Sequence, residues 1–170
     1  APKIDDPKIA LDLISKSIEV SGYKVGEDIF VALDAAASEF YKKNKYVLND
    51  KKKSLTTDEL IDYWGGLIKN YPIISIEDPF DEDDINGFAK FTNLYGKNLQ
   101  IVGDDLFVTS EKKLSEGIQK EAGNSILIKL NQVGTLTETL DTISKAKKHN
   151  FTTIISHRSG ETEDNFISDL

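Results

Sequence analysis

Five short apolar runs, separated by longer amphipathic segments, constrain the fold of this chain more than any other feature. They are IFVALD, PIISIED, LQIVGDD, SILIKLN and FTTIISH, at residues 29–34, 72–78, 99–105, 125–131 and 151–157. None alternates cleanly with polar residues, and near-continuous apolar strands are typical of a parallel sheet that is buried on both faces. The pattern therefore predicts an α/β fold in which five parallel strands are joined by right-handed crossover helices.

Capping signals mark where these helices begin and end. The predicted starts are Asp6 before Pro7, Thr56 with Glu59, and Thr135 with Glu138. The first is an N-cap followed by proline at the first helical position, and the other two have capping-box spacing. Glycines 22, 96 and 123 stand where a left-handed residue would end a helix. The longest gap, after Asp34, is predicted to be an exposed hairpin or loop with a solvated lysine run at 51–53.

Composition excludes several classes of protein. The chain has 170 residues, a formal net charge of −8 and no cysteine. Nucleic acids and anionic membranes attract basic surfaces, so we expect neither as a partner. Without cysteine there is no disulfide or thiolate chemistry, and no apolar run approaches the roughly 18 residues that cross a bilayer. The first residues lack the apolar region of a signal peptide, which favours a cytoplasmic location. The missing initial Met, and an end inside a candidate helix, suggest a segment of a longer protein.

Polar residues end each of the five predicted strands. In order they are Asp34, Glu77-Asp78, Asp104-Asp105, Lys129 and Ser156-His157-Arg158-Ser159. Both a sector of a (β/α) barrel and an open doubly wound sheet would bring these ends to one rim. Converging carboxylates repel one another unless a cation lies between them, and oxygen ligands favour Mg²⁺ first and Mn²⁺ next. Desolvation and a nearby metal would both disfavour the ammonium form of Lys129, which would suit it to act as a general base.

Each of these residues also has an ordinary structural explanation. An aspartate after a strand commonly caps a helix or closes a turn, and a lysine in a strand usually extends its ammonium into water. A single histidine is more often a surface residue than a catalytic one. The functional hypothesis depends on the ordered combination of three acids, one lysine and a Ser-His-Arg-Ser stretch, each at its own strand end.

The chain closely resembles the enolase family across nearly its whole length. The resemblance is carried by ALDAAASEF, SIEDPFDEDD, VGDDLFVTS, LIKLNQVGTLTET and SHRSGETEDNFISDL. It implies a partial (β/α) barrel of the enolase C-terminal type, with the N-terminal capping domain and the last barrel strand absent from residues 1–170. It also implies Mg²⁺-dependent dehydration of 2-phosphoglycerate to phosphoenolpyruvate, the reaction of phosphopyruvate hydratase in glycolysis.

The resemblance assigns roles to the acids and the lysine. Asp34, Glu77 and Asp104 match the ligands of the tightly bound Mg²⁺, and two ions are expected in the complete enzyme. Lys129 matches the base that removes the proton from C2 of the substrate. Because that proton is α to a carboxylate, its removal creates a doubly charged product that needs divalent metal charge in a dry site. Glu77, Asp104 and Lys129 are also implied to line the substrate site.

The final motif supplies the other implied substrate contacts. Arg158 and Ser159 match residues that bind the substrate phosphate, with Ser159 also assisting the second metal, and His157 lies close to the substrate. Ser156 belongs to the same substrate-binding stretch. An arginine suits phosphate because its planar guanidinium makes paired, charge-assisted hydrogen bonds. His149 is predicted to be a surface residue at a helix end, and Glu161 and Glu163 to be helix N-terminal acids.

Several parts of the family's site are outside this sequence. They include the glutamate general acid, the mobile loops over the substrate and a second lysine on the last strand. We therefore expect the isolated segment to be inactive. The family resemblance further implies a homodimer or higher oligomer of the full-length enzyme, and a cytoplasmic location with a cell-surface or secreted form as a secondary location.

Other functions fit parts of the pattern. A receiver-type phosphoacceptor domain also combines an acidic pair, Mg²⁺ and a late lysine, but it carries the acidic pair on its first strand. Here Asp104-Asp105 follow the third predicted strand, and another strand comes after Lys129. A non-catalytic binding role for an enolase segment is a further alternative. Racemases and cycloisomerases share the metal-acid layout, but SHRSGETED is not expected in them.

Overall fold

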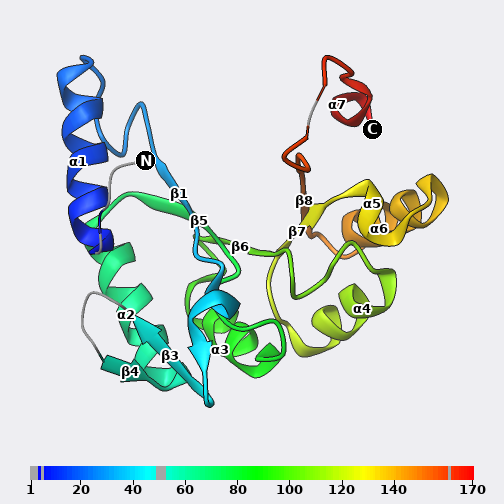
Figure 1. Ribbon diagram of the computed structural model, residues 1–170, viewed down its shortest axis with the longest axis horizontal. Helices are drawn as coiled ribbons and strands as arrows, with labels where there is room; N and C mark the ends of the chain where they lie inside the picture. The colour runs from blue at the N-terminus through cyan, green and yellow to red at the C-terminus, as the bar shows by residue number, and fades with distance from the viewer. Residues whose placement is uncertain (1–3, 5, 49–52, 161) are drawn as a thin grey trace. The chain divides into compact units, whose positions relative to one another are not determined.

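Five strands alternate with helices in the order that the apolar runs predict (Figure 1). The computed structural model describes residues 4, 6–48, 53–160 and 162–170, and the chain forms two compact units, Ala1–Asp81 and Glu82–Leu170. The predicted strands are β1 (Val31–Asp34), β5 (Ile73–Glu77), β6 (Gln100–Gly103), β7 (Ser125–Ile128) and β8 (Thr152–Ile155). The prediction of an α/β fold built on parallel strands is confirmed.

In the first unit, two helices accompany a parallel strand pair. β1 and β5 are in register so that Asp34 lies opposite Glu77. Helix α1 (Pro7–Val20) begins at the predicted N-cap, where the Asp6 carboxylate accepts a hydrogen bond from the Lys8 N–H. Helix α2 (Thr57–Asn70) begins with the predicted capping box. The Tyr71 hydroxyl donates to Asp12 at 2.7 Å, and this bond raises the pKa of Tyr71 above its usual value.

The long gap after β1 contains a small antiparallel sheet. The short 3₁₀ helix η1 (Ala37–Phe40) precedes the sheet. The strands are β2 (Tyr41–Lys42), β3 (Lys45–Leu48) and β4 (Lys53–Leu55), and they lie side by side in the order β2-β3-β4. The predicted hairpin is present, but it is not simply exposed, because Tyr46 is fully buried and its hydroxyl accepts from the Asp81 N–H at 3.0 Å. The prediction for the lysine run at 51–53 concerns side chains outside the described residues.

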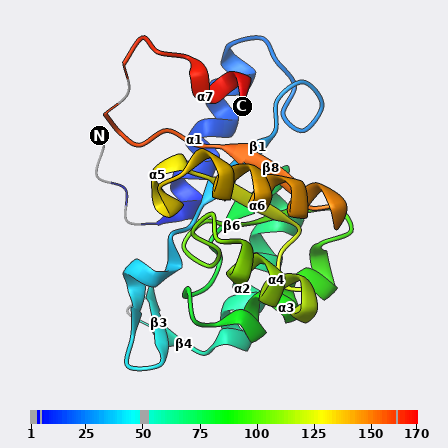
Figure 2. The same cartoon turned by 90° about the vertical axis from the view of Figure 1, so that its right-hand side faces the viewer.

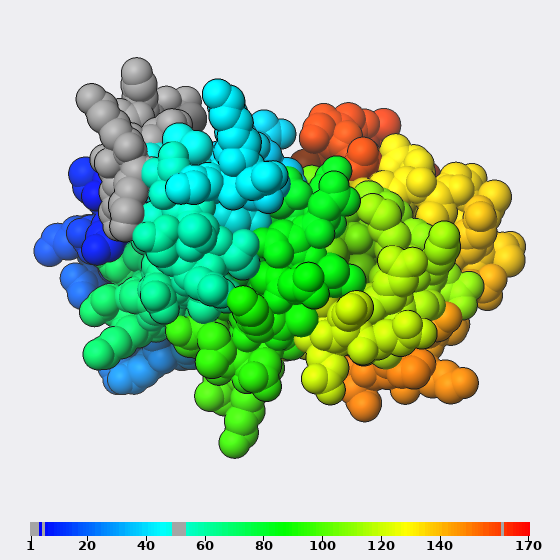
Figure 3. Space-filling view, turned by 90° about the horizontal axis from the view of Figure 1, so that it is seen from below, coloured from blue at the N-terminus to red at the C-terminus, as the bar shows by residue number. Residues whose placement is uncertain are grey.

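The second unit contains three parallel strands in the order β6-β7-β8. Its helices are α3 (Ile85–Tyr95), α4 (Glu111–Lys120), the single turn α5 (Leu130–Val133), α6 (Leu136–Lys148) and the terminal turn α7 (Phe166–Asp169). Helix α6 begins at the predicted cap Thr135 and packs against β7, β8 and α4 (Figure 2). In Figure 3 the yellow-green residues around α4 adjoin the yellow and orange residues that follow β7, so helices cover this side of the unit.

The structure tests the predictions made at three groups of helix-end residues. Gly22 and Gly123 have left-handed backbones as predicted, but the prediction for Gly96 is wrong, since its φ is −63°. A side chain there would place its Cβ 2.6 Å from the Thr92 carbonyl oxygen, so close packing accounts for that glycine. Glu163 is also not in the first turn of a helix, because α7 starts at Phe166, and Glu161 lies outside the described residues. His149 is the exposed C-cap of α6, as predicted.

The Phe107 ring lies between two glycines in the core of the second unit. A Cβ at Gly103 or at Gly117 would come within 2.5 or 2.4 Å of that ring, which is fully buried. The ring cannot move away without opening the core, because protein interiors are close-packed. These two glycines therefore fix the segment that follows β6, which includes Asp104.

We expect Gly117→Ala to destabilise the fold although alanine favours helices. Overpacking costs about 1–3 kcal/mol, whereas the gain in helix propensity is only about 1 kcal/mol. Gly66→Ala in α2 is the matched control, because a Cβ there meets nothing within 4 Å and the substitution should be neutral or stabilising. Urea unfolding of the polypeptide that contains this chain measures both. Equal stabilisation by the two substitutions would contradict the described packing around Phe107.

Candidate active site

The carboxylates of the first unit come from adjoining strand ends. Asp34 and Glu77 are cross-strand neighbours at the carboxyl ends of β1 and β5, and the Ala35 N–H donates to the Glu77 carbonyl at 2.9 Å. Neighbouring strands in a sheet are about 4.8 Å apart, so these two residues start from adjacent backbone positions. The predicted pairing of these two acids at one edge agrees with this arrangement.

The backbone just beyond these strands is strained. Ala36 and Asp78 have φ values of +43° and +41°, and Asp78 is almost completely buried. The Ala37 N–H donates to the Asp78 carbonyl at 3.1 Å, which links the two loops. Non-glycine residues in the left-handed region persist only where the surroundings hold them, and they concentrate at functional sites.

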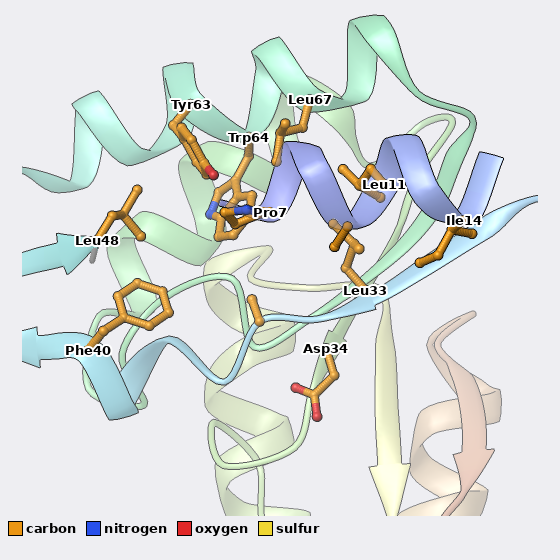
Figure 4. Close-up of a pocket in the computed structure, with 12 residues that line it drawn as sticks. Pro7, Leu11, Ile14, Leu33, Asp34, Phe40, Leu48, Tyr63, Trp64 and Leu67 are labelled. Atoms are coloured by element: carbon orange, nitrogen blue, oxygen red, sulfur yellow. The ribbon is translucent and has the colours of Figure 1, made fainter. Parts of the chain in front are cut away.

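A cavity of about 230 Å³ lies beside this edge, but it is not the acid site. It is lined mainly by apolar side chains of α1, β1 and α2, among them Leu11, Leu33 and Trp64. Figure 4 shows Leu33 directed toward the cavity and the Asp34 carboxylate directed away from it. Asp34 also borders the cavity, but successive residues of a strand point to opposite faces, so its carboxylate is directed away from the apolar lining.

The second unit brings the predicted base against a predicted ligand. Asp104 directly follows β6 and Lys129 directly follows β7, and the Lys129 ammonium forms an ion pair with Asp104 Oδ2. The two side chains are only 14% and 12% exposed. An ion pair with this little solvent has strong electrostatic coupling, since water screens it weakly. One carboxylate oxygen of Asp105 lies within 4.8 Å of one of Asp104.

Two residues that the sequence did not single out complete this arrangement. The Gln132 side-chain amide donates to Asp104 Oδ1 at 3.2 Å and accepts from the Thr109 hydroxyl at 2.6 Å. That hydroxyl in turn accepts from the Lys129 N–H at 2.9 Å. Both residues lie within motifs already quoted, and the position of Gln132 three residues after Lys129 is the available signal, because residues three apart share one side of a helical turn.

The Ser-His-Arg-Ser stretch follows β8 as an exposed segment. The Ser156 N–H continues the sheet by donating to the Ile128 carbonyl at 3.0 Å, which places this residue beside the end of β7. The His157 Nδ1 accepts from the Ser159 N–H at 2.9 Å, and Ser159 is left-handed with a φ of +66°. Arg158 is exposed.

The donor chemistry of these strand ends fits a hard divalent cation. The candidate ligands are the carboxylates of Asp34, Glu77 and Asp104, and the chain offers no thiolate. Oxygen-only donor sets suit Mg²⁺, Ca²⁺ and Mn²⁺ rather than softer metals. Asp34 and Glu77 belong to the first unit and Asp104 to the second, so the meeting of all three acids stays a prediction. None of the helices within the described residues is long and apolar enough to cross a membrane.

Comparison with known proteins decides the family. The model of the enolase C-terminal TIM barrel domain matches residues 1–170. The chain belongs to the enolase family. Enolase from Natranaerobius thermophilus is 55% identical over 170 residues, which is all of this chain and 40% of that protein. The chain thus spans well under half the length of the curated relative it matches, and the predicted partial barrel of the enolase C-terminal type is confirmed.

Proposed function

We propose that the polypeptide containing this chain is a phosphopyruvate hydratase, which removes water from 2-phosphoglycerate to form phosphoenolpyruvate. The observation that carries the proposal is the position of the Lys129 side-chain nitrogen against the Asp104 carboxylate at adjoining strand ends, with both side chains mostly buried. A base that must abstract a weakly acidic proton needs a fixed position and little competing water.

Lys129 in its neutral form accepts the proton from C2 of the substrate. The electron pair of the broken C2–H bond moves toward the substrate carboxylate, and it forms the C2–C3 double bond when hydroxide leaves C3. The ammonium that Lys129 becomes is stabilised by the Asp104 carboxylate that it already contacts. In the first step this chain therefore supplies a positioned amine, and the Asp104 carboxylate beside it stabilises the charged form of that amine.

Asp34, Glu77 and Asp104 are the residues that would hold Mg²⁺. The metal, when bound, supplies positive charge that offsets the negative charge developing on the substrate carboxylate. The proposal of Mg²⁺ over softer metals is supported by the all-carboxylate donor set and by membership of the enolase family. Two ions are proposed for the complete enzyme.

The stretch from Ser156 to Ser159 is proposed to hold the substrate. Arg158 would bind the phosphate through paired hydrogen bonds from its guanidinium, with Ser159 beside it. Ser156 and His157 would line the same side, since Ser156 lies next to the end of β7. We also propose a cytoplasmic homodimer or higher oligomer, by analogy with the family rather than from contacts within this chain.

The direct test is an assay of the polypeptide that contains this chain with 2-phosphoglycerate. We expect phosphoenolpyruvate to form with Mg²⁺, to stop after removal of the metal with a chelator, and to resume when Mg²⁺ is restored. Chelation should leave the far-ultraviolet circular dichroism unchanged, because a buried apolar core rather than the proposed metal holds the fold together. Product formed at the same rate in chelator would refute the proposed metal dependence.

A further inference from the structure

The second unit contains a closed circuit of hydrogen bonds that begins and ends on the proposed base and ligand. Lys129 donates through its backbone N–H to Thr109 Oγ1, and the Thr109 hydroxyl donates to Gln132 Oε1. Gln132 Nε2 donates to Asp104 Oδ1, and the Lys129 ammonium contacts Asp104 Oδ2. We call the two middle residues, Thr109 and Gln132, the Thr109–Gln132 bridge.

The direction of every bond in this bridge is fixed by donor and acceptor chemistry. A threonine hydroxyl has one proton, and here its oxygen is occupied as an acceptor by the Lys129 N–H. Its proton has two acceptors, Gln132 Oε1 at 2.6 Å and the Leu127 carbonyl at 3.4 Å, and the shorter bond is the one to Gln132. Gln132 then presents its carbonyl oxygen toward Thr109 and its NH₂ toward Asp104. The opposite amide orientation would set a carbonyl oxygen against the Asp104 carboxylate. The Thr109 hydroxyl and the Asp104 carboxylate thus favour the same amide orientation, in which Gln132 donates to Asp104.

Thr109 is itself held in an unfavourable but well-supported conformation. Its φ is +56° and that of Val108 is +42°, in the left-handed region that β-branched residues rarely adopt. It is fully buried, and its carbonyl accepts from the Thr142 hydroxyl at 2.9 Å. The Val108 N–H donates to the Asp104 carbonyl at 2.7 Å, so the same turn also carries the backbone of Asp104. Strain of this kind is retained where surrounding contacts impose it.

We propose that Thr109 and Gln132 are positioning residues that set the orientation of the Asp104 carboxylate relative to Lys129. Neither needs to touch the substrate, and neither titrates. With Oδ1 held by Gln132 and Oδ2 by Lys129, the carboxylate plane is fixed before any ligand binds. Substituting a residue that hydrogen-bonds to a metal ligand typically lowers metal affinity or activity by about 10- to 100-fold. This inference rests on the proposed function for the roles of Asp104 and Lys129.

The test compares two substitutions at one position in the polypeptide that contains this chain. Thr109→Val keeps the shape and the β-branch but removes the hydroxyl, and Thr109→Ser keeps the hydroxyl. We expect Thr109→Val to lower kcat and weaken Mg²⁺ binding, measured by calorimetry without substrate, by about 10-fold each. Thr109→Ser should restore both to within about threefold, and KM for 2-phosphoglycerate should change much less than kcat.

A substitution at Gln132 also tests the inference, including the case in which Thr109→Val fails to fold. Gln132 is only partly buried, so Gln132→Met is expected to fold and to show the same losses. Where all variants fold, combining Thr109→Val with Gln132→Met should add little, because both break one chain of bonds. Fully additive losses, or wild-type kcat and Mg²⁺ affinity in Gln132→Met, would overturn the positioning role. A wild-type protein that binds Mg²⁺ without dehydrating 2-phosphoglycerate would instead refute the proposed function, and the Mg²⁺ affinities would still test the bridge.

Discussion

Lys129→Ala should reduce kcat for dehydration of 2-phosphoglycerate by about 10²- to 10⁴-fold, the usual contribution of a positioned general base. The Lys129 amine is mostly buried and its charged form is paired with Asp104, so water cannot replace it efficiently. Binding of Mg²⁺ should be retained or slightly strengthened, because the substitution removes a positive charge from beside the proposed metal ligand Asp104. Steady-state assays and Mg²⁺ calorimetry on the same preparation separate the two effects.

Lys145→Ala is the matched control for that substitution. Lys145 also forms an ion pair, with Glu111 at 2.8 Å, but it lies on the partly exposed surface of α6. Surface pairs of this type contribute little, so we expect kcat within about twofold of wild type. A Lys129→Ala protein that turns over as fast as Lys145→Ala would remove the base from the proposed mechanism.

Asp104→Asn should mainly weaken Mg²⁺ binding, whereas Lys129→Ala should mainly lower kcat. The amide has nearly the same shape as the carboxylate but lacks its charge, and Asp104 is mostly buried with two donors directed at its oxygens. We expect Mg²⁺ affinity to fall by more than about 100-fold, since the substitution removes a proposed ligand itself rather than a residue that orients the ligand. Activity should fall with it and recover only in part at high Mg²⁺.

Asp141→Asn controls for the loss of one negative charge. This aspartate is on the exposed side of α6, and its substitution should leave Mg²⁺ affinity unchanged. The comparison is made by calorimetry at constant ionic strength, because long-range effects of charge depend on salt. Equal Mg²⁺ affinity in the two variants would exclude Asp104 as a metal ligand.

Local signals predicted much of the fold. Strand positions followed from apolar runs such as SILIKLN, and helix starts followed from caps at Asp6, Thr56 and Thr135, because both depend on neighbours a few residues away. The positions of Asp104 and Lys129 after their strands followed from the same reasoning. The ion pair between these two residues, and their hydrogen bonds with Thr109 and Gln132, did not follow from local signals.

The parts that sequence reasoning missed depend on long-range packing. Tyr46 is buried with its ring against Phe80, and its hydroxyl accepts from the Asp81 N–H, 35 residues away. Nothing local to the hairpin signals these contacts. The sequence position of Gly96 predicts a left-handed helix end, but a glycine is required there because a Cβ would lie too close to the Thr92 carbonyl. Gln132 lies between Asp104 and Thr109, and Thr109 has a left-handed backbone that β-branched residues rarely adopt, so local propensity does not predict this arrangement.

The central claim is that the Lys129 amine takes the proton from C2, and hydrogen exchange measures that step apart from loss of hydroxide. The polypeptide that contains this chain is incubated in deuterated water with 2-phosphoglycerate and Mg²⁺, and deuterium at C2 of the remaining substrate is followed by nuclear magnetic resonance. We expect exchange with the wild-type protein, and none above background with Lys129→Ala under conditions in which that variant still binds Mg²⁺. Exchange at the wild-type rate in Lys129→Ala would contradict the account.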